Sequence, residues 1–176
     1  MKALSYLFLG VLITGGNQGK AQLMVEDSGL AAAIQIYGEP ILSANPNLYL
    51  STSNPWGPWG SPDSYYSFTN DYGPLGSPES LHGVANEYGE GLEVEIPTYG
   101  DKTMKILLSA NPYLYMSTAN DYGPAGAPES YYSITNDYGP NGAAENLHGV
   151  ANEYGEGLKI RLLDAPLDAP LELDAP

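Results

Sequence analysis

The chain has 176 residues, of which 43% are hydrophobic and 15% are charged, so it can bury a core and is not disordered by composition. Six Lys and Arg residues stand against 21 Asp and Glu residues, a formal net charge of −15. This balance excludes a general nucleic-acid backbone binder and a protein that docks electrostatically on anionic lipid. Because the sequence has no cysteine, it also excludes disulfides, thiolate zinc sites and cysteine nucleophiles.

Residues 1–21 have the pattern of a secretory signal peptide. Lys2 precedes an apolar run over 3–12, and the small residues Gly19 and Ala21 suit cleavage after Ala21. The run is short for a membrane span, and the alternative interpretation is a buried N-terminal helix. We therefore expect a secreted protein, extracellular or at the cell surface, without stable membrane insertion.

The rest of the chain is a tandem duplication. Residues 41–54 recur at 107–120, and residues 81–92 recur at 147–158, both at an offset of 66 residues. A repeat of this length determines the architecture of a chain more than any local feature does. The predicted organisation is a signal peptide (1–21), an N-terminal segment (22–40), repeat 1 (41–97), repeat 2 (98–162) and an acidic tail (163–176).

A finer period of 16 residues runs inside each repeat. It is marked by Asn54, Asn70 and Asn86 and by Asn120, Asn136 and Asn152. Five of these six asparagines are followed by Asp or Glu, then Tyr and Gly, and such residues favour turns. Between the turns lie short runs rich in Tyr, Thr and Val, such as 64–69, 80–85 and 92–96. Evenly spaced short runs are typical of strands in all-β proteins.

We predict an all-β fold of two tandem repeats, each of about 66 residues and about five short strands. So many strands do not stay in one flat open sheet, which favours an antiparallel meander or sandwich. The alternative is a β-solenoid with 16-residue rungs, in which the repeated asparagines stack as a ladder.

The two ends of the chain carry apolar segments. Residues 29–37 suit a short helix or an extra strand, and Ala31–Tyr37 is a candidate for donation to another subunit. In the tail, Pro near every fourth residue forbids a helix and predicts an extended, polyproline-like chain. This tail is interpreted either as a disordered acidic terminus or as a stalk or docking strand. The residues expected to mediate assembly are Ala33, Ile34, Ile36, Leu163, Leu167 and Leu171.

No residue pattern indicates catalysis, and we predict that the protein is not an enzyme. His82 and His148 occupy equivalent positions of the two repeats and are interpreted as strand residues, and no Gly-x-Ser-x-Gly motif is present. The acids recur in the turns, as scaffold residues do, although a hydrolase using Glu79 and Glu145 is a third, weaker class. No cofactor is expected; calcium is the alternative, with hard oxygen ligands from Asp71, Glu79, Asp137 and Glu145.

Aromatic residues in turns predict a binding surface. Trp56 and Trp59 flank a Gly-Pro pair, and exposed rings there can stack on sugars or on a partner protein. The alternative is that the tryptophans pack over the end of a sheet. The candidate ligand-binding residues are Trp56, Trp59, Tyr72, Tyr122 and Tyr138.

Together these features predict a secreted structural or adhesive protein. It would be a fibre, filament or matrix subunit that partners with itself by β-strand addition, because short strands leave edges that an apolar segment can complete. Head-to-tail donation of this kind does not close and gives filaments. The alternative function is a carbohydrate-binding module whose turn aromatics bind glycans.

Overall fold

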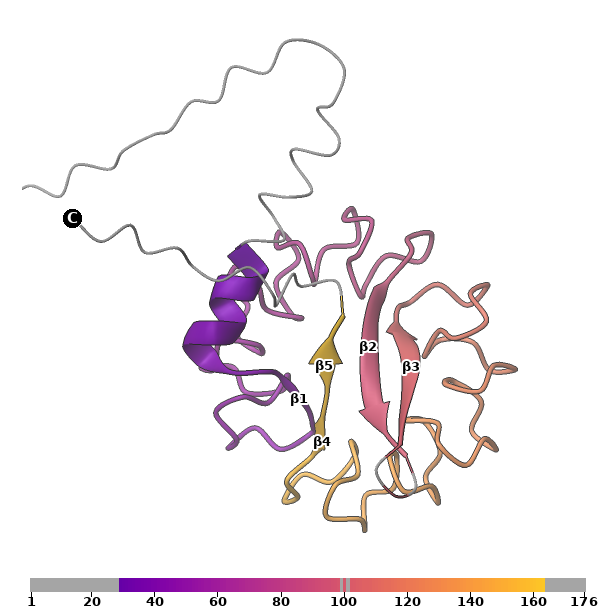
Figure 1. Cartoon of the computed structure of the whole chain (residues 1–176). Coiled ribbons are helices and arrows are strands. Elements are labelled where there is room, and N and C mark those ends of the chain that lie inside the picture. The colour runs from indigo at the N-terminus through magenta and orange to yellow at the C-terminus, as the bar shows by residue number, and fades with distance from the viewer. Residues whose placement is uncertain (1–28, 99, 101, 164–176) are drawn as a thin grey trace, which may run out of the picture.

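The computed structural model describes residues 29–98, 100 and 102–163. Within this part the strands are β1 (Ile41–Leu42), β2 (Leu92–Pro97), β3 (Thr103–Leu108), β4 (Leu158–Lys159) and β5 (Arg161–Leu162). The helix of this part is short, over residues 29–37 (Figure 1). The described residues thus form two small antiparallel sheets with little helix, which agrees with the predicted β class. The predicted signal peptide and most of the tail, including Leu167 and Leu171, lie outside the described residues.

The segment 158–162 joins the two sheets at the centre of the molecule. Its first half, β4, pairs with β1, and its second half, β5, pairs with β2, which also pairs with β3. The pairing is interrupted at Ile160, whose N–H donates to the Pro40 carbonyl at 3.3 Å. Just after β5, the Leu163 N–H donates to the Glu93 carbonyl at 3.1 Å. The spatial order is therefore β1, β4–β5, β2, β3, with turns on both sides (Figure 1).

Strand pairing follows the same scheme in the two repeats. Leu92 of repeat 1 pairs with Leu108 of repeat 2, and their equivalents Leu158 and Leu42 pair with each other. Asn45 Nδ2 donates to the Gly155 carbonyl at 2.9 Å, and the equivalent Asn111 Nδ2 donates to the Gly89 carbonyl at 2.8 Å. Every ladder between the described strands joins one repeat to the other, so neither repeat completes a sheet alone.

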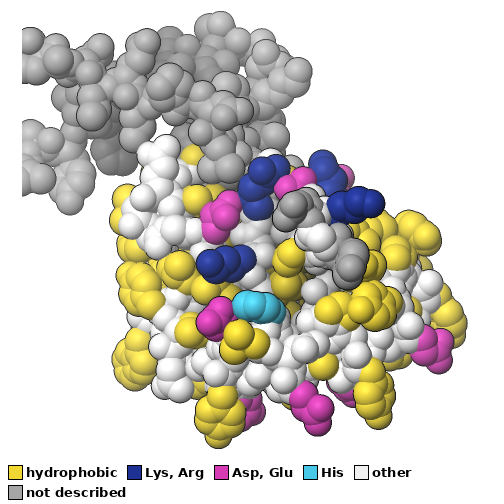
Figure 2. Space-filling view, turned by 60° about the horizontal axis from the view of Figure 1, so that its bottom comes forward, with side chains coloured by type: hydrophobic (Ala, Val, Ile, Leu, Met, Phe, Trp, Pro, Cys, Tyr) yellow, Lys and Arg dark blue, Asp and Glu magenta, His cyan; other side chains and the backbone are white. Residues whose placement is uncertain are grey.

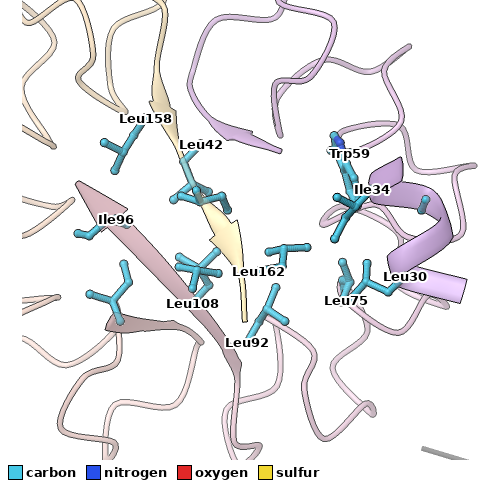
Figure 3. Packing of buried hydrophobic residues seen from close by; sticks show 14 of the residues in the cluster. Leu30, Ile34, Leu42, Trp59, Leu75, Leu92, Ile96, Leu108, Leu158 and Leu162 are labelled. Atoms are coloured by element: carbon cyan, nitrogen blue, oxygen red, sulfur yellow. The ribbon is translucent and has the colours of Figure 1, made fainter. Parts of the chain in front are cut away.

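Alternation along the strands gives the sheets one apolar and one charged face. The buried side chains of the apolar face are Leu92, Val94, Ile96, Ile106, Leu158, Ile160 and Leu162. Their burial supplies the main favourable term in folding. Figure 3 shows these side chains continuing into a second group, in which Trp59 and Leu75 pack beside Leu30 and Ile34 of the helix.

The N-terminal helix is part of this core. Leu30, Ala33 and Ile34 are buried, whereas Ile36 is 72% exposed. The helix ends at Tyr37, and the following Gly38 has a φ of 95°, which favours glycine, and donates its N–H to the Ile34 carbonyl at 2.8 Å. Of the two predicted forms of residues 29–37 the helix is the one observed and the extra strand is wrong, and Ala33 and Ile34 pack into the core of their own chain.

Trp59 belongs to the same group, so its predicted role in ligand binding is wrong. The side chain is fully buried, and its indole N–H donates to the Gly38 carbonyl at 3.0 Å. Its ring meets Phe68 edge-to-face at 6.4 Å between ring centroids. The alternative interpretation placed both tryptophans over the end of a sheet; Trp59 is buried, whereas Trp56 is 91% exposed.

The charged face of the sheets collects basic residues. Lys102, Lys105, Lys159 and Arg161, the Lys and Arg residues of the described part, gather on one side of the molecule (Figure 2). Lys105 Nζ lies 2.7 Å from Glu93 Oε1, and Arg161 Nη2 lies 2.9 Å from Glu95 Oε2. Elsewhere the charged side chains of this part are acidic.

Candidate binding surface

Each 16-residue unit contains a turn that one asparagine side chain holds. Asn70 Oδ1 accepts the N–H of Tyr72 at 2.9 Å, and Asn70 Nδ2 donates to the Ser64 carbonyl at 3.0 Å. The same pair of hydrogen bonds recurs at Asn54, Asn86, Asn120, Asn136 and Asn152. An Asn side chain that bonds the backbone two residues ahead is an Asx turn, so these positions define six equivalent anchored turns.

The glycine after each aromatic residue is required by close packing. A Cβ atom at Gly73 would collide with the Tyr65 carbonyl oxygen, and one at Gly139 would lie 2.7 Å from the Tyr131 carbonyl oxygen. Residues larger than glycine therefore do not fit without a backbone shift. This explains why the motif ends in Gly directly after the aromatic residue.

Serine side chains connect one unit to the next. Ser67, which is fully buried, donates its Oγ–H to the Trp59 carbonyl at 3.0 Å and accepts the Thr69 N–H at 3.1 Å. The neighbouring Phe68 N–H also donates to the Trp59 carbonyl, at 3.0 Å. Equivalent serine bonds occur at Ser51, Ser117 and Ser133.

These side-chain bonds replace the strands predicted in the same segments. Residues 64–69 and 80–85 form successive turns, so the prediction of strands there is wrong, whereas 92–96 lies within β2 as predicted. Ser and Asn offer the backbone local partners that compete with a ladder. Tyr, Ser and Thr occur both in strands and in turns of this kind, so the composition of these segments did not distinguish the two structures.

The residue two places after each anchoring asparagine is an exposed aromatic. The exposed fraction of these six side chains is 86–98%. They are Trp56, Tyr72, Tyr88, Tyr122, Tyr138 and Tyr154, which we call the aromatic array. Four of the five predicted ligand-binding residues belong to it, and only the buried Trp59 does not. Tyr88 and Tyr154 were missed, although the repeated Asn-Glu-Tyr-Gly motif marks them.

None of the six rings of the array belongs to the hydrophobic core cluster or packs against it. Each ring leaves apolar surface in water, although the five tyrosines also keep a hydroxyl group there, and the anchored turn itself needs only the Asn and the Gly. In five of the six turns an acid precedes the ring, at Asp71, Glu87, Asp121, Asp137 and Glu153. Figure 2 shows hydrophobic side chains projecting from the rim of the molecule, with acidic side chains beside some of them.

The histidines and acids singled out in the sequence do not converge. His82 Nδ1 lies 3.3 Å from the Gly91 carbonyl oxygen, and His148 Nδ1 lies 3.8 Å from Glu156 Oε2 with both side chains largely exposed. Within residues 29–98, 100 and 102–163, no three His, Asp or Glu side chains form a group that could hold a metal ion. Asp71, Glu79, Asp137 and Glu145, the calcium candidates, are thus not members of such a group.

A groove of about 560 Å³ on the charged face was not predicted. Glu95, Arg161, His148, Glu156 and Lys159 contribute to its lining. The Arg161–Glu95 pair neutralises charge inside it, so the groove does not present a field of one sign. Charged and apolar residues alternate at 93–95 and at 159–161, and this alternation was the sequence signal that could have revealed the charged face.

Comparison of the chain with family models, curated proteins and solved structures finds no match. Among the residues that the structure describes, no helix has the length and apolar character needed to cross a membrane.

Proposed function

We propose that the chain is an extracellular adhesive protein that binds through the aromatic array and does not catalyse a reaction. The observation that carries this proposal is the exposure of six aromatic side chains in equivalent anchored turns. Export rests on the signal-peptide pattern of residues 1–21. A structural or matrix role is consistent with the same surface, because a set of repeated weak contacts suits attachment to another surface better than it suits catalysis.

Two physical features make the array suitable for attachment. Tyr and Trp provide a large amphipathic contact area with few rotatable bonds, so little entropy is lost on binding. The Asn bonds hold the backbone on which each ring is mounted; Asn120 Oδ1, for example, accepts the Tyr122 N–H at 3.0 Å. Several weak contacts on one rigid body also gain from effective concentration, so total affinity exceeds that of any single ring.

A carbohydrate-binding module is the second candidate function, and Trp56 favours it. This ring is the largest of the array, is 91% exposed, and follows Pro55 instead of an acid. Stacking of an indole on a sugar ring would then concentrate binding at one turn. Trp59 no longer supports this candidate because it is buried.

A glycan array probed with three proteins separates the two candidates. The proteins are the wild type, Trp56→Ala, and a triple variant with Tyr72, Tyr122 and Tyr138 changed to Ser. The adhesive proposal predicts that the triple variant loses more binding signal than Trp56→Ala does on every glycan that the wild type binds. If Trp56→Ala loses its binding signal while the triple variant binds as well as the wild type, the result would support the carbohydrate-binding module and refute the adhesive proposal.

A further inference from the structure

The last segment of the sheet, residues 158–162, fills a slot within repeat 1. One side of this segment pairs with β1 and the other with β2. Among the described strands, β1 and β2 do not contact each other. Without the segment, repeat 1 would therefore present two unpaired edges facing a common slot, and unpaired edges accept a strand readily.

The segment fits this slot by both shape and position in the chain. Leu158, Ile160 and Leu162 are no more than 1% exposed, and the side chains between them lie on the charged face. Its partners β1 and β2 are distant in sequence, so no turn ties it to them. By contrast, β2 and β3 form a local hairpin, in which the Thr98 N–H donates to the Lys102 carbonyl at 2.8 Å.

Charge makes the slot selective for this segment. Arg161 pairs with Glu95 across the β5–β2 register. The equivalent segment of repeat 1 carries Glu93 and Glu95 where residues 158–162 carry Lys159 and Arg161. A β2-like strand in the slot would place like charges opposite each other, which destabilises cross-strand pairs.

Other edges are partly covered by the chain itself. Ile41 donates to the Leu50 carbonyl at 2.9 Å and bridges to Ser51, and the equivalent Leu107 donates to the Met116 carbonyl at 2.9 Å and bridges to Ser117. A strand from another molecule therefore meets occupied positions at Ile41 and Leu107. The slot between β1 and β2 is the place where an incoming strand gains partners on both sides.

We propose that residues 158–162 are exchanged between copies of this chain, with the segment of one copy inserted into the slot of the next. Strand insertion of this kind uses main-chain bonds for affinity and side-chain pockets for specificity. Because the donor segment and the slot are different surfaces, serial exchange gives open chains of molecules, unless the exchange closes into a dimer or ring. Strand exchange would add a route of assembly to the proposed adhesive role. The proposal is argued from the strand pairing alone and does not depend on the aromatic array.

Cysteine pairs in the full-length protein test the exchange, because the natural chain has no cysteine. The test variant carries Glu95→Cys with Arg161→Cys, and the control carries Glu95→Cys with Lys105→Cys. Both pairs are directly opposed in the sheet. The first joins β2 to the segment that fills the slot, and the second joins β2 to β3 within the local hairpin. Each protein is unfolded, refolded at low and high concentration, and treated with a short bis-maleimide crosslinker.

Exchange predicts a covalent ladder for the slot pair that grows with protein concentration, while the hairpin pair stays crosslinked within single chains. Slot-pair crosslinks confined to single chains at every concentration would overturn the proposal. A ladder of equal size for both pairs would also overturn it, because it would reflect collisions instead of exchange. Neither result depends on adhesion, so failure here is distinguishable from failure of the proposed function.

Discussion

Glu95 and Arg161 occupy the same position in the two repeats and form an ion pair with each other. They are directly opposed in the β2–β5 register, and Arg161 Nη2 lies 2.9 Å from Glu95 Oε2. The approximate two-fold axis that relates the repeats therefore passes between these two residues. If the repeats were identical in sequence, two copies of the same residue would face each other here. Two acids there would repel, whereas the change of sign in repeat 2 turns the repulsion into attraction.

Reversing one of these charges is expected to destabilise the protein. Arg161→Glu removes the attraction and adds a like-charge contact, but Arg161 is half exposed, so the free energy of unfolding should fall by only about 1–2 kcal/mol. Urea unfolding measures the change. The double exchange Glu95→Arg with Arg161→Glu should recover most of the loss; a double variant no more stable than the single one would show that the pair does not govern pairing of the repeats.

The two neighbouring tryptophans are expected to respond differently to truncation. Trp59→Ala removes a fully buried ring beneath the helix and should cost about 3–5 kcal/mol of unfolding free energy. Trp56→Ala removes an exposed ring and should change it by less than about 0.5 kcal/mol. Denaturant unfolding of both variants checks this; equal losses would contradict the placement of Trp59 in the core.

The anchoring asparagines are expected to hold their turns. Asn70→Ala loses both the bond to the Tyr72 N–H and the bond to the Ser64 carbonyl, and should cost about 1–2 kcal/mol. Asn70→Asp keeps the acceptor and loses the donor, so its loss should be smaller. Amide hydrogen exchange adds a local readout: the Tyr72 N–H should exchange faster in the Ala variant than in the Asp variant, and equal rates would argue against the anchor.

Local patterns in the sequence predicted the β class and the turns but not how the repeats meet. The 16-residue motif identified the anchoring asparagines and most of the exposed rings because their partners are two to six residues away. The pairing of Leu92 with Leu108 and of Leu158 with Leu42 joins different repeats, and no local pattern encodes it. Trp56 and Trp59 were likewise inseparable, because burial of Trp59 depends on a helix placed by the fold.

Retention on a hydrophobic surface, measured for variants that lose one, two or three of Tyr72, Tyr122 and Tyr138 to Ser, tests the adhesive account most directly. Matched controls change Asp71, Asp121 and Asp137 to Asn and keep every ring. The account predicts that retention falls with each ring removed, while the Asn controls bind at least as well as the wild type. Retention of the triple Tyr variant equal to that of the wild type, with its unfolding free energy unchanged, would contradict it.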